Sequence, residues 1–80
     1  MNIKYKAIFT DLGNGLIYVR LPDLDVGTQG YGYEDACMMV KDLLKIMIEE
    51  YTEANKEMPT PTDLDYRTLE ENQTIIEVEI

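Results

Sequence analysis

The chain has 80 residues, of which 45% are hydrophobic and 29% are charged, a composition typical of one small folded domain. This length excludes a second domain, so a single domain over residues 1–80 is expected. Sixteen acidic residues against seven basic ones give a net charge of −9. The bases are scattered along the sequence, which argues against a nucleic-acid-binding surface and makes a basic protein the natural partner.

Two further features bear on chemistry and location. Histidine is absent, so acid-base catalysis near neutral pH would need a carboxylate with a strongly raised pKa, and no enzymatic activity is expected. The single cysteine, Cys37, excludes an internal disulfide. The longest apolar run, residues 36–40, is too short for a membrane span. A cytoplasmic protein that does not bind membranes is therefore expected.

The first thirty residues predict three short strands. Residues 3–10 alternate with a period of two, so that one side of the segment carries Tyr5, Ala7 and Phe9 and the other carries Lys4, Lys6 and Ile8. This pattern is typical of a strand with one solvent-exposed face. The Asn-Gly pair at 14–15 supplies the positive φ angles of a tight turn, and a second strand follows over residues 16–21. Pro22 ends that strand, a polar turn follows, and a third strand is expected from residue 27 to residue 30 or 31.

Residues 34–54 have the apolar period of a helix, the strongest signal in the sequence. Gly32 is expected as the N-cap, and Asn55 is expected to end the helix in a left-handed conformation. At 100° per residue, one stripe about 100° wide is expected to face a sheet. The residues of this stripe are Ala36, Val40, Leu43, Leu44, Met47, Tyr51 and Ala54.

Other apolar residues widen this stripe. Cys37 and Ile48 lie on one flank, Met39 and Ile46 lie on the other, and Met38 falls among polar residues. The excess width has two interpretations: contact with a second copy of the chain, or flanks that tuck under loops of the same chain. The first predicts a homo-oligomer, most simply a dimer. Its interface candidates are Met38, Met39, Ile46 and Ile48.

The last third of the chain predicts a connection and a fourth strand. Pro59 and Pro61 favour an extended segment, residues 63–72 are expected to form a short acidic helical turn, and residues 74–80 alternate as a strand. The predicted fold class is α+β: a two-layer β-β-β-α-β domain with an antiparallel three-stranded meander, a fourth strand, sheet order 4-1-2-3, and one long helix on one face. A right-handed crossover would make the fourth strand parallel to the first, as in part of a ribonuclease H fold.

Several segments together resemble HicB-type antitoxin domains. They are Lys-Tyr-Lys-Ala-Ile-Phe at 4–9, Tyr-Val-Arg-Leu-Pro-Asp-Leu at 18–24, Thr-Gln-Gly at 28–30 and Tyr-Glu-Asp-Ala at 33–36. The resemblance covers nearly the whole chain. It implies a degraded ribonuclease H-like domain that binds a small basic HicA-type ribonuclease toxin and covers its active surface. The chain departs from the family at 25–27, where Asp-Val-Gly replaces the common Pro-Gly-Cys.

The same resemblance bears on nucleic acids and cofactors. Many members of the family carry an additional C-terminal DNA-binding segment, whereas this chain stops after the predicted fourth strand, so no direct nucleic-acid binding is expected. Ribonuclease H chemistry needs carboxylates that converge on two metal ions, one of them from the middle of the first strand, where this chain has none. No catalytic residue, metal or cofactor is expected. The alternative to an antitoxin is a stand-alone HicB-like regulatory or structural domain that has no toxin partner.

Acidic residues crowd the C-terminal end of the predicted helix and the segment that follows. The helix dipole disfavours a carboxylate there by about 0.3–1 kcal/mol. These carboxylates either steer a cationic toxin toward the domain or form a solvated face that keeps the protein soluble. The partner-binding candidates are Glu49, Glu53, Glu57, Asp63, Asp65, Glu70 and Glu71.

Overall fold

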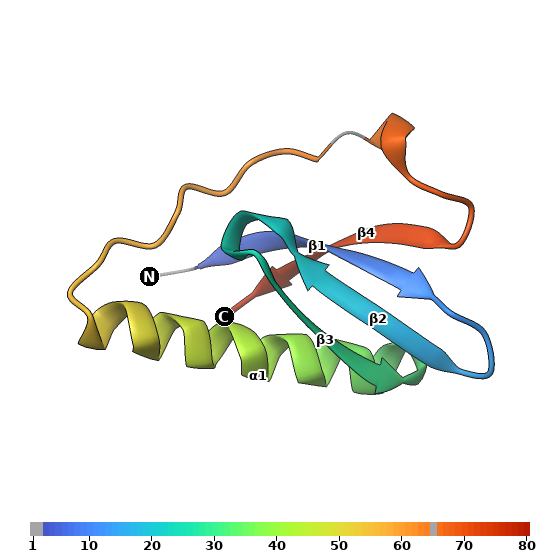
Figure 1. Ribbon diagram of the computed structural model, residues 1–80, viewed down its shortest axis with the longest axis horizontal. Coiled ribbons are helices and arrows are strands. Elements are labelled where there is room, and N and C mark those ends of the chain that lie inside the picture. The colour runs from blue at the N-terminus through green and yellow to red at the C-terminus, as the bar shows by residue number, and fades with distance from the viewer. Residues whose placement is uncertain (1–2, 65) are drawn as a thin grey trace.

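Four antiparallel strands and one long helix form two layers in the computed structural model, which describes residues 3–64 and 66–80. The sheet order is β3-β2-β1-β4, with α1 on one face and the return segment, residues 54–64 and 66–72, crossing the other (Figure 1). The predicted fold class and strand order are confirmed. The elements are β1 (Lys4–Asp11), β2 (Leu16–Leu21), β3 (Val26–Tyr31), α1 (Gly32–Glu53) and β4 (Gln73–Glu79), with short 3-10 turns at Pro22–Leu24 and Tyr66–Thr68.

The direction of β4 corrects the sequence-based expectation. β4 is antiparallel to β1, with Lys4 opposite Glu79 and Thr10 opposite Gln73. The helix starts beside the β1–β2 turn, where the Gly32 N–H donates to the Gly15 carbonyl at 2.7 Å, and its 22 residues carry the chain about 33 Å to the other end of the sheet. A direct crossover from there would make β4 parallel to β1. The return segment instead runs back along the sheet, so β4 starts beside the β1–β2 turn and runs antiparallel.

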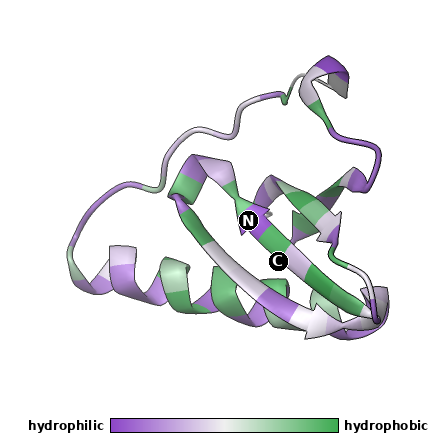
Figure 2. Cartoon of the chain, turned by 45° about the vertical axis from the view of Figure 1, so that its right-hand side comes forward, coloured by the Kyte–Doolittle hydropathy of each residue, from purple (hydrophilic) through white to green (hydrophobic). Residues whose placement is uncertain are grey.

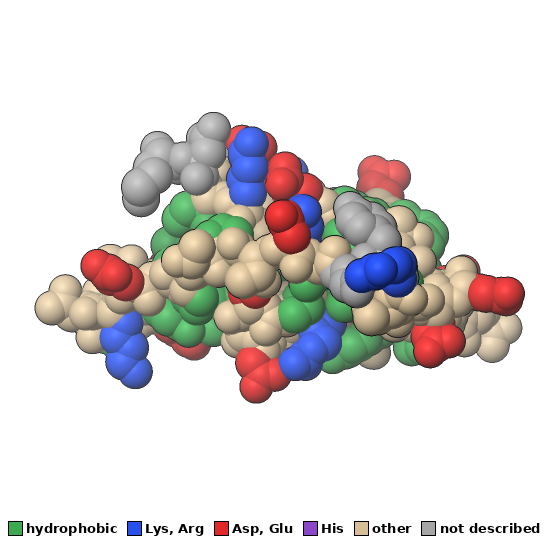
Figure 3. Space-filling view, turned by 90° about the horizontal axis from the view of Figure 1, so that it is seen from above, with side chains coloured by type: hydrophobic (Ala, Val, Ile, Leu, Met, Phe, Trp, Pro, Cys, Tyr) green, Lys and Arg blue, Asp and Glu red, His purple; other side chains and the backbone are tan. Residues whose placement is uncertain are grey.

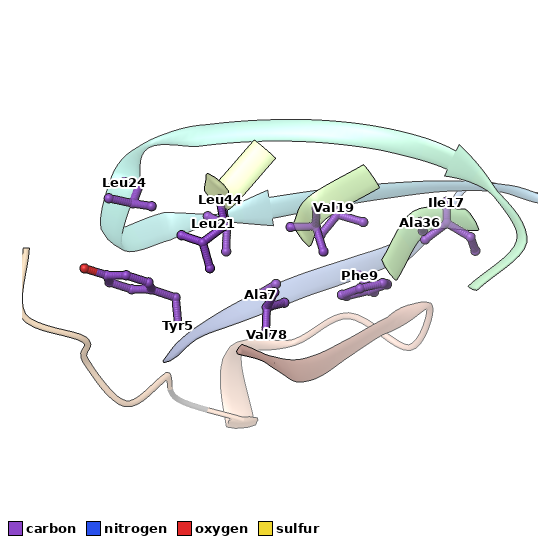
Figure 4. Packing of buried hydrophobic residues seen from close by; sticks show 11 residues of the cluster. Tyr5, Ala7, Phe9, Ile17, Val19, Leu21, Leu24, Ala36, Leu44 and Val78 are labelled. Carbon is purple, nitrogen blue, oxygen red and sulfur yellow. The ribbon is translucent and has the colours of Figure 1, made fainter. Parts of the chain in front are cut away.

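The core lies between the sheet and α1 because the buried residues alternate along β1 and β2. Figure 4 shows these side chains pointing toward residues of the helix and β4. Of the predicted helical stripe, three residues are buried and three are half-buried, whereas Ala54 is exposed because it lies beyond the last helical residue. The buried core consists of Tyr5, Ala7, Phe9, Ile17, Val19, Leu21, Leu24, Ala36, Val40, Leu44 and Val78.

Backbone geometry fixes both ends of α1. The Asp35 carboxylate accepts the Tyr31 N–H at 2.9 Å, and Tyr31, rather than the predicted Gly32, is the N-cap. At the other end Asn55 has φ 57°, as predicted, and the Asn55 N–H donates to the Thr52 carbonyl. The Lys56 N–H reaches the Tyr51 carbonyl at 2.9 Å. These two bonds form a Schellman motif, so the helix end was predicted correctly.

Gly30 allows α1 to start directly on β3. A Cβ atom at this position would lie 2.7 Å from the Ala36 nitrogen and 2.8 Å from its Cα. Both are backbone atoms, so a larger residue would push the first helical turn away from the sheet. Figure 2 shows hydrophobic and hydrophilic bands alternating along α1, as expected for a helix with one buried face.

Candidate functional site

The exposed side of α1 carries much of the protein's excess negative charge. The helix contains six carboxylates and two lysines, and its last turn has no basic residue. The carboxylates at its C-terminal end therefore face the negative end of the helix dipole without a compensating cation on that turn. This arrangement lowers the stability of the free domain, and an external cation would relieve it.

One strip of α1 combines exposed apolar residues with carboxylates. Met39, Asp42, Ile46, Glu49 and Glu53 follow one another at intervals of three or four residues and so share one side of the helix. All five are exposed, with Met39 at 40% and Ile46 at 50%. We call these five residues the helix strip. Its apolar residues adjoin two predicted partner-binding residues, Glu49 and Glu53.

The predicted oligomer-interface residues do not share one environment. Ile48 packs against the core, as does Cys37 on the same flank, so this flank tucks into the chain itself. Met38 is 61% exposed, and Met39 and Ile46 lie on the opposite, open flank. The interpretation that the flanks tuck under the same chain thus fits the flank of Cys37 and Ile48. The flank of Met39 and Ile46 is free to make a second contact. A role for the open flank in self-association stays a prediction.

An open groove of about 540 Å³ lies next to the C-terminal end of α1. It is lined by residues 3–5 of the first strand region and residues 57–61 of the return segment, so Glu57, another predicted partner-binding residue, forms part of its wall. The Tyr5 hydroxyl points toward the return segment and donates to the Pro59 carbonyl (Figure 4). Burial, with further contributions from Asp23 and Tyr51, raises the pKa of Tyr5.

This groove leaves no signal in local sequence patterns because its two walls are more than 50 residues apart in the chain. Alternation along the first strand correctly placed Tyr5 on one side of the sheet. Nothing in the local pattern indicated that its hydroxyl would reach across to the return segment. The groove therefore forms through long-range contacts alone.

The remaining predicted acidic residues lie elsewhere. Asp63 accepts a hydrogen bond from the Lys6 ammonium at 2.6 Å, and this bond holds the pKa of Asp63 below its usual range. Glu70 and Glu71 precede β4 at the end of β1 opposite the groove, about 23 Å away at the usual rise per strand residue. Asp65 lies outside the described residues. The predicted set is therefore not one surface.

The sheet face crossed by the return segment has a different character. Figure 3 shows acidic and basic side chains interspersed on this face. Ion pairs join Lys4 to Glu79 at 3.7 Å and Arg20 to Asp25 at 2.5 Å, in addition to the pair made by Lys6. These pairs neutralise charge locally, whereas the carboxylates of the helix strip take part in no ion pair among the described residues.

Residues 3–64 and 66–80 lack two further kinds of feature. No group of three or more His, Cys, Asp or Glu side chains in these ranges is placed to hold a metal ion. No helix within them has the length and apolar character needed to cross a membrane.

Comparison with solved structures finds a match to a chain of a toxin-antitoxin complex from Streptococcus pneumoniae. The TM-score is 0.79 at 25% sequence identity, and the match covers 99% of this chain and 69% of that chain. No protein-family model matches the sequence, and no curated protein matches it. The chain therefore shares its fold with a component of a toxin-antitoxin complex, whereas the resemblance to HicB-type domains stays a prediction from the residues.

Proposed function

We propose that this domain is an antitoxin-like module that binds a small basic toxin and blocks its active surface. The fold match over 99% of the chain to a component of a toxin-antitoxin complex is the observation that carries this proposal. The net charge of −9 favours the antitoxin side of such a pair, because a protein that cleaves RNA needs a basic surface for its polyanionic substrate.

The helix strip is the part of the domain best suited to this partner. Carboxylates around exposed Met39 and Ile46 combine an apolar centre with a charged rim, the usual composition of a protein interface. The uncompensated charge at the end of α1 becomes favourable when lysines or arginines of a partner approach. Glu57 extends the same acidic end into the groove.

Neutralisation by this route requires no chemistry from the domain. Covering the basic surface of a ribonuclease excludes its RNA. The carboxylates of the domain then bind the lysines and arginines that would otherwise bind RNA phosphates. We infer a HicA-type ribonuclease as the toxin and a HicB-type role for the domain, on the strength of the sequence segments that resemble that family. In this proposal the domain is a binding protein and has no enzymatic activity.

The test takes any small basic protein encoded next to this chain's gene as the candidate toxin. The two proteins are mixed, and association rates and RNA cleavage are measured. We expect a stoichiometric complex, loss of RNA cleavage, and an association rate that falls steeply as salt rises. Cleavage that continues at saturating domain concentration would contradict neutralisation.

Two charge-reversal variants locate the contact. Glu49→Lys with Glu53→Lys alters the helix strip, whereas Glu70→Lys with Glu71→Lys makes the same change in net charge at the other end of β1. The first pair should slow association at least tenfold at low salt, and the second much less. Equal effects would show that only the overall charge matters and would remove the helix strip from the proposal.

The second candidate function is a stand-alone HicB-like regulatory or structural domain without a toxin. The locally neutralised charges on the sheet face would suit a contact that does not depend on strong electrostatic attraction. Absence of any small basic protein beside the gene, together with capture of a neutral or acidic partner, would favour this alternative.

A further inference from the structure

The free edge of β4 lacks several of the features that usually protect the edge of a sheet. β4 pairs with β1 on one side and is the last strand in the sheet. Its seven residues, Gln-Thr-Ile-Ile-Glu-Val-Glu, include no proline, lysine or glycine, and they are rich in β-branched side chains. An edge of this kind readily pairs with another strand.

The outward-facing backbone groups of β4 can be identified from its pairing with β1. Ile3 and Ile80 exchange both of their backbone hydrogen bonds, and the Asp11 N–H donates to the Asn72 carbonyl. In an antiparallel pair such hydrogen-bonded positions recur at every second residue, so the even-numbered residues of β4 bond to β1. The N–H and C=O groups of residues 73, 75, 77 and 79 therefore point to the free edge. Among the described residues, only the Gln73 N–H of this set has a backbone acceptor, the Glu70 carbonyl.

The opposite edge of the sheet is better protected. By the same alternation, residues 27, 29 and 31 of β3 direct their backbone groups outward, since Gly32 bonds to Gly15. The Asp35 carboxylate already accepts the Tyr31 N–H, and Gly27 is a poor strand former. The first turn of α1 also lies directly against Gly30. Between the two edges, β4 is the one open to a partner strand.

The side of β4 that faces α1 is only partly covered. Val78 is buried, but Ile76 is half-buried, and Thr74 and Ile80 are exposed. A second sheet placed beside β4 would continue the layer and cover this apolar margin. The exposed margin and the open backbone groups thus lie along the same strand.

We propose that β4 pairs with β4 of a second copy of this chain, antiparallel and centred on Ile76, to give a continuous eight-stranded sheet. Hydrogen-bonded pairs must join residues whose backbone groups point outward on both strands. With Ile76 opposite its counterpart, Ile75 faces the second copy's Glu77 and Gln73 faces the second copy's Glu79. Residues 73, 75, 77 and 79 would each form a pair that exchanges two backbone hydrogen bonds. Because the Gln73 N–H of each copy already donates to the Glu70 carbonyl, about six of these bonds can form.

Charge selects this register over its neighbours. Centring the pair on Ile75 would place Glu71 opposite the second copy's Glu79, and centring it on Glu77 would place that residue opposite its own counterpart. Like charges directly opposite each other destabilise a strand pair. Only the register centred on Ile76 keeps every carboxylate opposite an uncharged residue over the length of β4. Both helices then lie on the same face of the extended sheet, because residues opposite each other share a face.

A matched pair of substitutions at Ile75 tests the contact and its register. Ile75→Lys places an ammonium opposite the second copy's Glu77, and Ile75→Glu places a carboxylate there, while both lose the same contact with Ile8 of β1. Sedimentation over a range of concentrations gives the dimer dissociation constant, and circular dichroism confirms that both variants are folded. We expect dimers of the unmodified chain and a dissociation constant about tenfold lower for Ile75→Lys than for Ile75→Glu.

A cysteine scan provides a second readout. In a Cys37→Ser background, Ile76→Cys should form an intermolecular disulfide faster than Ile75→Cys or Glu77→Cys, because only residue 76 lies opposite its own counterpart. A 9.2 kDa species at every concentration would overturn the proposal. So would equal dissociation constants for the two Ile75 variants, faster cross-linking at 75 or 77, or pairing of the β4 edge with a different protein alone.

Discussion

Replacing Glu53 with lysine should stabilise the free domain while weakening its association with a basic partner. Glu53 is the last residue of α1, and its neighbours three and four residues earlier, Glu50 and Glu49, carry the same charge. The helix dipole disfavours a carboxylate here and favours an ammonium, each by about 0.3–1 kcal/mol. The change also replaces two like-charge contacts with opposite-charge contacts worth about 0.2–0.5 kcal/mol each. After allowance for solvent exposure, we expect a gain of about 1 kcal/mol.

Thermal unfolding measures this gain. For a domain of this size, 1 kcal/mol corresponds to an increase in Tm of about 4–8 °C. The increase should be largest at low salt and shrink at about 0.5 M salt, because these contacts are exposed. Glu71→Lys is the control, since it changes the net charge equally in a turn outside α1 and should leave Tm nearly unchanged. A lower Tm for Glu53→Lys, or a gain insensitive to salt, would refute the electrostatic reasoning.

Three further predictions concern the scaffold. Gly30→Ala should cost about 1–3 kcal/mol in urea unfolding, because its Cβ would meet the backbone of the first turn of α1. Leu44→Ala should cost about 2–5 kcal/mol by the same assay, whereas Ile46→Ala, on the exposed helix strip, should change stability by less than about 0.5 kcal/mol. The hydrogen bond from Lys6 lowers the pKa of Asp63 in the folded state below the ordinary pKa of 3.8. The pair therefore stabilises the fold at pH values above 3.8, and this stabilisation is lost as the pH falls through the lowered pKa. The free-energy difference between the unmodified chain and Asp63→Asn should therefore be similar at about pH 7 and pH 5 and shrink as the pH falls below the ordinary value of 3.8.

Local sequence patterns predicted those parts of the fold that local physics determines. The Asn-Gly turn at 14–15 adopts positive φ angles, β2 has the predicted bounds, and Asn55 ends α1 in the left-handed region. Each depends on the conformational preference of one or two residues or on a short periodic run. The three buried residues of the helix all belong to the predicted stripe, because the spacing of apolar side chains fixes which side of a helix can be buried.

The features that were missed depend on where the chain goes after α1. The direction of β4 is set by the path of the return segment, and that path is held by side chains distant in sequence. Thr62 bonds to Asp23 through both its backbone N–H and its hydroxyl, and Asp63 bonds to Lys6. Periodicity reports neighbours within one element only, so these contacts left no signal in the sequence. The same path separates Glu70 and Glu71 from the helix strip, although all were predicted as one acidic set.

The two proposed contacts should respond to salt in opposite directions, which allows them to be separated in one set of measurements. Two chains of charge −9 repel each other, and in the β4 pair only uncharged residues face the carboxylates, so added salt should strengthen self-association. Association of the helix strip with a cationic protein should instead weaken as salt screens the attraction. Sedimentation of the domain alone, and then with the basic partner, at low salt and at about 0.5 M salt would show both trends. If self-association also weakened with salt, its contact would involve opposite charges, and the β4 pairing centred on Ile76 would be wrong.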